Sequence, residues 1–67
     1  MSREDNFLTE REAALGERVS IRLREDEGYR DLLGILLELD CVEKKDGSRH
    51  RFDPEAIAYF RVVVTPA

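Results

Sequence analysis

The sequence predicts a mainly β fold: a small five-stranded barrel with a short N-terminal helix and a one-turn 3₁₀ helix before the last strand. Three observations lead to this prediction. Residues 18–24 alternate strictly between polar and apolar side chains, which is typical of a half-buried strand. Asp46-Gly47 lies between two short strand-like runs, the strongest local signal for a hairpin. Residues 60–64 are dense in β-branched side chains and end shortly before Pro66.

The chain has 67 residues, which is enough for one domain. We expect residues 1–15 to form a tail with a short helix, and residues 16–65 to form the barrel. Thr9 and Glu12 have the spacing of a capping box, in which each side chain bonds the other residue's free backbone N–H. Gly16 is expected to end the helical segment in a left-handed conformation.

The first strand is predicted over residues 18–24. Its inner face consists of Val19, Ile21 and Leu23, and the residues between them are polar. Three carboxylates followed by a glycine, at residues 25–28, break the alternation. The chain is therefore expected to turn there.

Residues 31–40 are ambiguous, because they contain many leucines and leucine is a good helix former. Gly34 interrupts the middle of this run, where a bent barrel strand tolerates glycine better than a helix does. Glu38 then resumes an alternating pattern between Leu37 and Leu39. We predict one long strand that is kinked near Gly34.

The second half of the chain contains three more predicted elements besides the last strand. Asp46-Gly47 joins strands at 41–45 and 48–52, and both turn residues are expected to adopt positive φ. An aspartate before a proline predicts one capped 3₁₀ turn over 53–57. The last strand is predicted at 60–64.

This order of elements is that of an SH3-like (Sm-like) barrel. Curling the sheet into a barrel also removes the exposed edges that an open five-stranded sheet of this size presents. The predicted core consists of Val19, Ile21, Leu23, Leu36, Val42, Phe52, Ile57, Phe60 and Val62.

Residues 16–64 carry motifs of a known family. They are Gly16-x-Arg18-Val19-x-Ile21-Arg22, Asp31-Leu32-Leu33-Gly34-x-Leu36, a Lys-Asp-Gly hairpin, Phe52-x-Pro54 and a final Phe60-Arg61-Val62-Val63. This set resembles the N-terminal SH3-like domain of actinobacterial GNAT-type acetyltransferases, in which the barrel precedes the catalytic domain. The resemblance implies an accessory domain in a family that keeps its chemistry elsewhere in the chain.

Two departures from that family affect the expectation. The acetyltransferase domain is absent from these 67 residues, so we expect no enzymatic activity from this chain, which is either a stand-alone relative or a fragment. Ile35 is apolar where an outward polar residue is expected. A weaker similarity, to the C-terminal barrel of ribosome maturation factors, is carried by the alternation over 18–24 and by Ile57-Ala58-x-x-Arg61-Val62.

Composition limits the classes of function. Fifteen acidic residues against eleven basic ones give a formal net charge of −4, which opposes non-specific binding to nucleic acid. No stretch approaches the roughly 20 apolar residues of a membrane span, and the N-terminus lacks a signal-peptide core. One cysteine excludes an intramolecular disulfide. We expect a cytoplasmic setting, no membrane contact and no cofactor.

Three features suggest chemistry but have a simpler explanation. His50 is interpreted as a structural or surface histidine, because no serine, cysteine or carboxylate is placed by sequence to form a triad with it. Cys41 is interpreted as a small buried side chain, because its sequence neighbours supply no cation to activate it. The acidic turn at 25–27, with Asp31, does not have the spacing of a calcium loop. We predict neither catalytic nor metal-binding residues.

Two groups of side chains form the candidate interaction surface. Leu33, Ile35 and Leu37 are the apolar excess of the long strand, and about half of that strand must face outward. The other group consists of outward arginines of the first and fourth strands, with tyrosines at their rim: Arg22, Arg24, Arg49, Arg51, Tyr29 and Tyr59. For these arginines we favour the simpler explanation that they pair with glutamates across strands, at Glu17, Glu25, Glu38 and Glu43, because acidic residues are so abundant.

The outward apolar side chains need a cover. We expect the N-terminal helix to supply it, with self-association next and a neighbouring domain third. The predicted function is a non-catalytic accessory or interaction module that contacts a protein partner or itself. The alternative is an RNA- or ribosome-associated barrel that uses the arginine face; nucleic-acid binding is not favoured by the net charge.

Overall fold

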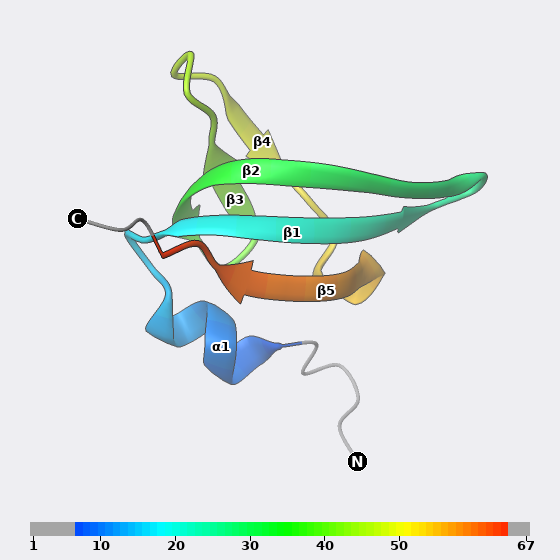
Figure 1. Ribbon diagram of the computed structural model, residues 1–67, viewed down its shortest axis with the longest axis horizontal. Helices are drawn as coiled ribbons and strands as arrows, with labels where there is room; N and C mark the ends of the chain where they lie inside the picture. The colour runs from blue at the N-terminus through cyan, green and yellow to red at the C-terminus, as the bar shows by residue number, and fades with distance from the viewer. Residues whose placement is uncertain (1–6, 65–67) are drawn as a thin grey trace.

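The computed structural model describes residues 7–64 and contains one five-stranded antiparallel sheet, a short helix and a 3₁₀ turn (Figure 1). The sheet has the order β4-β3-β2-β1-β5. This order, with the 3₁₀ turn directly ahead of β5, confirms the predicted SH3-like fold class. The elements are α1 Leu8–Ala13, β1 Arg18–Glu25, β2 Gly28–Glu38, β3 Cys41–Glu43, β4 Arg49–Arg51, η1 Pro54–Ala56 and β5 Ile57–Val62.

The hairpin of β1 and β2 is the longest part of the sheet. Its register runs from Arg18 opposite Ile35 to Glu25 opposite Gly28, so β2 begins three residues before the predicted Asp31. Every residue from 24 to 31 is exposed, and Figure 1 shows this end of the hairpin reaching beyond the other strands. Because the tip needs no core contacts, the apolar pattern did not mark where β2 begins.

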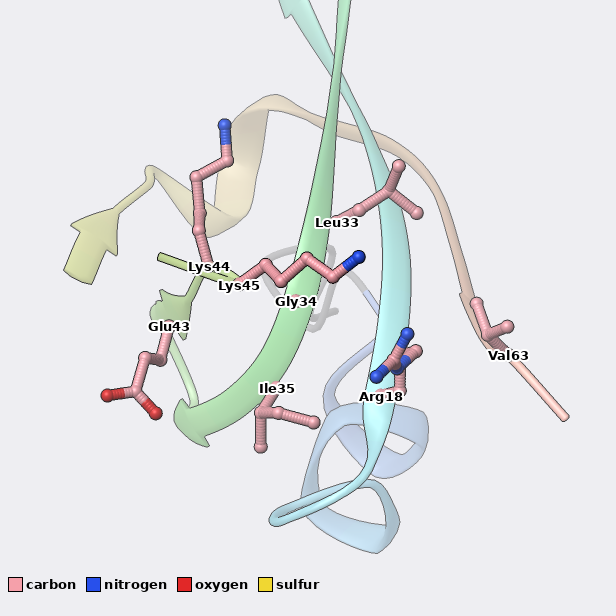
Figure 2. A pocket seen from close by; sticks show the side chains of 8 residues that line it. All are labelled: Arg18, Leu33, Gly34, Ile35, Glu43, Lys44, Lys45 and Val63. Atoms are coloured by element: carbon pink, nitrogen blue, oxygen red, sulfur yellow. The ribbon is translucent and has the colours of Figure 1, made fainter. Parts of the chain in front are cut away.

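β2 is one strand, as the sequence predicts, and it curves as it passes Gly34 (Figure 2). Leu32, Gly34 and Leu36 share the inner face, and both leucines are buried. A Cβ at Gly34 would lie 2.5 Å from Cγ1 of Val42 and would also collide with the carbonyl oxygen of Glu43. Only a residue without a side chain lets the β3 backbone pass this closely.

The core agrees with the prediction except at one position. Val62 is 39% exposed, because it lies near the end of the edge strand β5. The buried apolar set adds Ala14, Leu32 and Cys41 to the remaining predicted residues.

The helix α1 begins differently from the prediction. The capping box of Thr9 and Glu12 does not form: the N-cap is Phe7, at φ 55°, and no side chain caps the helix. The Phe7 ring instead contacts the rings of Tyr59 and Phe60, with centroids 6.4 and 6.3 Å away. Packing of an aromatic ring on β5 therefore outweighs the local hydrogen bonds of a capping box.

Two hydrogen bonds connect α1 and the residues that follow it to the C-terminal end of β2 and the residue after it. Gly16, at φ 86° as predicted, donates its N–H to the carbonyl of Leu36 at 2.8 Å. Arg11 is only 3% exposed and donates from Nη1 to the carbonyl of Leu39 at 2.9 Å. Neither helix within residues 7–64 has the length and hydropathy that a membrane span requires.

The β3–β4 hairpin forms at the predicted place with a different turn. Gly47 donates its N–H to the carbonyl of Lys44 at 2.9 Å and adopts φ 90°, whereas Asp46 keeps a negative φ. The expectation of positive φ at both residues was wrong, because a longer loop with glycine as its left-handed residue closes this hairpin. Both strands are consequently shorter than predicted.

The last part of the chain has the predicted order of elements, but its last strand is Ile57–Val62 and not 60–64. Asp53 caps η1 by accepting the N–H of Glu55 at 3.0 Å. β5 begins at Ile57, earlier than the predicted Phe60, because its pairing with β1 continues to Leu23 through a register shift.

We predict that Gly34→Ala destabilises the protein by about 1–3 kcal/mol, the usual cost of forcing an extra methyl group into a packed site. Urea denaturation followed by circular dichroism measures the change. The control is Leu33→Ala at the neighbouring exposed position, for which we expect a change within about 0.5 kcal/mol. Equal stability of Gly34→Ala and the wild type would contradict the close approach of β3.

Candidate interaction surface

The outer face of β5, β1 and β2 gathers most of the predicted surface residues. Arg22 lies opposite Asp31 on one side and Tyr59 on the other, and Arg24 lies opposite Tyr29. Arg61, opposite Ser20, joins the same face. We call Arg22, Arg24, Arg61, Tyr29 and Tyr59 the arginine–tyrosine face. Arg61 was not predicted, although its place between the apolar Phe60 and Val62 is the signal that would have found it.

Arg22 is partly neutralised within this face. Its Nε lies 3.0 Å from Oδ1 of Asp31, and its guanidinium lies 5.8 Å from the centroid of the Tyr29 ring. The hydrogen bond from Arg22 lowers the pKa of Asp31, and the same bond raises the pKa of Arg22. Both side chains are about half exposed, so the pair contributes little to stability. A polar hollow of about 360 Å³ lies beside this pair, lined also by Ser20, Tyr59 and Arg61.

Arg49 and Arg51 do not join this face. They lie on β4, which β3 and β2 separate from β1. Arg51 pairs locally, with 3.0 Å between its Nη2 and Glu38 and 2.7 Å between its Nη1 and Asp40. The hydrogen bond to Glu38 is the main cause of the raised pKa of Arg51. The predicted pairing with Glu38 is therefore confirmed for Arg51, whereas Arg22 pairs with Asp31, a carboxylate that was not among the predicted partners.

A hollow of about 550 Å³ lies on the outer side of the bend in β2 (Figure 2). We call it the Gly34 hollow. Leu33, which is 54% exposed, lines it and Ile35 is half-buried. Figure 2 shows Lys44 and Glu43 on one side of β2, and Arg18 and Val63 on the other. The full lining is Arg18, Leu33, Gly34, Ile35, Glu43, Lys44, Lys45 and Val63.

The N-terminal helix does not cover the outward apolar side chains. α1 packs against β5 instead, and Leu33 and Leu37 remain exposed. Leu15, which follows α1, is itself exposed. The expectation that the helix is the cover was wrong, because Phe7 and Ala14 bind it to the core.

The β3–β4 hairpin brings together a serine, a histidine and a carboxylate that the sequence did not predict. Ser48 Oγ lies 2.7 Å from Oδ1 of Asp46 and 3.0 Å from Nε2 of His50. Because the hydroxyl donates its one proton to Asp46, the His50 nitrogen is the donor in the second contact. In a catalytic triad the histidine lies in the middle: the carboxylate accepts its N–H, and its other nitrogen accepts the serine proton. Here the serine lies in the middle, between Asp46 and His50, so the arrangement is not that of a catalytic triad.

The same hydrogen bonds shift the acidity of Asp46. The Ser48 hydroxyl is the main cause of the lowered pKa of Asp46, and the Ser48 backbone N–H adds to the effect. Cys41, the other residue with reactive potential, is buried as predicted.

We predict that Ser48→Ala raises the pKa of Asp46 toward 3.8, because the donor that stabilises the carboxylate is removed. A lowered pKa stabilises the fold at pH values above the pKa of the unfolded aspartate, and this stabilisation is lost as the pH falls through the pKa of the folded state. Carboxyl carbon NMR titration measures the pKa, with Ser20→Ala as the control. An identical Asp46 titration in Ser48→Ala and the wild type would contradict the role of the hydroxyl.

Comparisons with known proteins add no identification. No protein-family model, no curated protein and no solved structure matches the chain. Within residues 7–64, no group of three or more histidine, cysteine or acidic side chains is arranged to hold a metal ion.

Proposed function

We propose that this chain is a non-catalytic interaction module that contacts a protein partner through the Gly34 hollow and the sheet face around it. The observation that carries the proposal is the exposure of Leu33 in a hollow of about 550 Å³ that the apolar side chains of Ile35 and Val63 also line. Exposed apolar patches rimmed by polar groups mark interaction sites in soluble proteins.

The distribution of charge supports a specific partner. Among the described residues, the two hollows on this face and the neighbouring Arg24 contribute six cations, and the linings of the hollows include the carboxylates of Asp31 and Glu43, in a chain whose net charge is −4. Such segregation favours an acidic partner and speeds its association. The cations are Arg18, Arg22, Arg24, Lys44, Lys45 and Arg61.

The resemblance to the accessory barrel of GNAT-type acetyltransferases is part of the same proposal. The order of the strands and the bend at Gly34, within the Asp31–Leu36 motif, are compatible with it. In this proposal the module works in the cytoplasm, and any acetyltransferase activity belongs to a separate catalytic domain. A second copy of the chain is the other protein partner that the surface allows.

We predict that purified protein enriches specific peptides from a displayed random library, and that Leu33→Glu weakens their binding at least tenfold. The substitution places a charge among the apolar side chains that line the hollow. Leu15→Glu is the matched control, because Leu15 is a similarly exposed leucine that does not line the hollow. Fluorescence polarisation measures the affinities. No enrichment, or equal losses in both variants, would contradict the proposal.

The arginine–tyrosine face supports one other candidate function, an RNA- or ribosome-associated barrel. Arginine and tyrosine side chains are suited to phosphates and to stacked bases, and here Tyr29 and Tyr59 flank Arg22. The acidic net charge and the ion pair between Arg22 and Asp31 argue against it.

Titration with single-stranded RNA decides between the two candidates. We predict no binding at about 50 mM salt, because few phosphates would be neutralised. Binding that weakens steeply between about 50 and about 200 mM salt, and that Arg24→Ala with Arg61→Ala abolishes, would favour the RNA function instead.

A further inference from the structure

The distal half of β2 has one unpaired edge. Residues 28–34 pair with β1 on one side, and the pairing with β3 begins only at Ile35. Figure 1 shows β3 and β4 at one end of the β1–β2 hairpin, which continues without a neighbour above β2. Within the described residues, no other strand pairs with this segment of β2.

The hydrogen bonds of Leu36, near the C-terminal end of β2, show which way the backbone N–H and C=O groups of β2 point. Leu36 donates its N–H to the carbonyl of Glu17 and accepts the N–H of Gly16, so its backbone groups point to the β1 side. Directions alternate along an antiparallel strand. The N–H and C=O groups of Tyr29, Asp31 and Leu33 therefore point to the open edge.

This open edge leads into the Gly34 hollow. Leu33 belongs to both, and Figure 2 shows Lys44 on the side of β2 that faces away from β1. A strand laid along residues 29–33 would therefore reach Lys44 and Lys45 at one end. Its side chains on the outer face would lie beside Leu33 and the hollow.

We propose that an extended acidic peptide segment of a partner protein adds to the open edge of β2, pairing with residues 29–33. This proposal rests on the proposed function and names the partner's chemistry and its mode of binding. Main-chain hydrogen bonds to Tyr29, Asp31 and Leu33 hold the segment. An apolar side chain enters the Gly34 hollow, and carboxylates of the peptide bind Lys44 and Lys45.

Two other occupants fit less well. A second copy of the chain would bring the same cationic hollow with it, and a two-fold pairing centred on Asp31 would place two aspartates opposite each other. RNA has no peptide groups to continue a β-ladder, and the apolar side chains of Leu33, Ile35 and Val63 offer it no ring to stack on.

Amide hydrogen exchange tests the pairing directly in the unmodified protein. In the free protein we expect the amides of Tyr29, Asp31 and Leu33 to exchange faster than those of Arg30 and Leu32. The probe is a capped heptapeptide that alternates glutamate with valine, and its lysine–valine counterpart is the control. Saturation with the acidic probe should slow the three fast amides at least tenfold, and the basic control should leave them unchanged.

A pair of substitutions at one position separates the backbone from the side chain. Asp31→Pro removes the N–H that faces the open edge and leaves the pairing with β1 intact, because proline is tolerated on edge strands. Asp31→Ala removes the same ion pair with Arg22 but keeps the N–H. We expect Asp31→Pro to bind the acidic probe about five- to tenfold more weakly than Asp31→Ala.

The outcomes distinguish this inference from the proposed function. If library-selected peptides bind in a Leu33-dependent way but leave the three amides unprotected, edge pairing is wrong and the interaction module stands. If no peptide binds, both fail. Protection that rises with protein concentration alone would assign the edge to a second copy, and protection by single-stranded RNA would assign it to nucleic acid. If Asp31→Pro does not fold, the exchange measurement on the wild type still decides.

Discussion

The contact between Gly34 and the backbone of β3 is the constraint on which the rest of the structure depends. With the carbonyl of Glu43 and the side chain of Val42 against its α-carbon, β2 bends and carries β3 over the core. The bend buries Leu36 and Val42 on the inner side. On the outer side lies the Gly34 hollow, and the pairing of β2 with β3 reaches only as far as Ile35 opposite Glu43.

Charge is arranged around the same bend. Some cations are matched by nearby carboxylates, as Arg22 is by Asp31 and Arg51 is by Glu38 and Asp40. Arg18, Lys44 and Lys45 instead line a hollow in which, within residues 7–64, Glu43 supplies the one lining carboxylate. An acidic protein thereby presents a local cationic surface, and a charged patch of this kind influences which partners approach it.

The larger errors of sequence reasoning have one physical origin. The capping box at Thr9 was outweighed by ring contacts of Phe7 with residues some fifty positions later in the chain. Arg11, an ordinary helix residue by sequence, is buried because the carbonyl of Leu39 lies within its reach. A pattern in a short stretch of sequence does not reveal contacts with residues that lie far away in the chain.

The sequence by itself determined the fold class, the five strands, the Asp53 cap and most of the core. Alternating side chains, turn residues and caps act over a few positions, so these features can be predicted from short stretches of the sequence. Only the tertiary structure decided which surfaces meet: it separated Arg49 from Arg24, joined Tyr29 and Tyr59 to Arg22, and left Leu33 uncovered. Strand order and the path of α1 set these neighbours, and both depend on packing between distant segments.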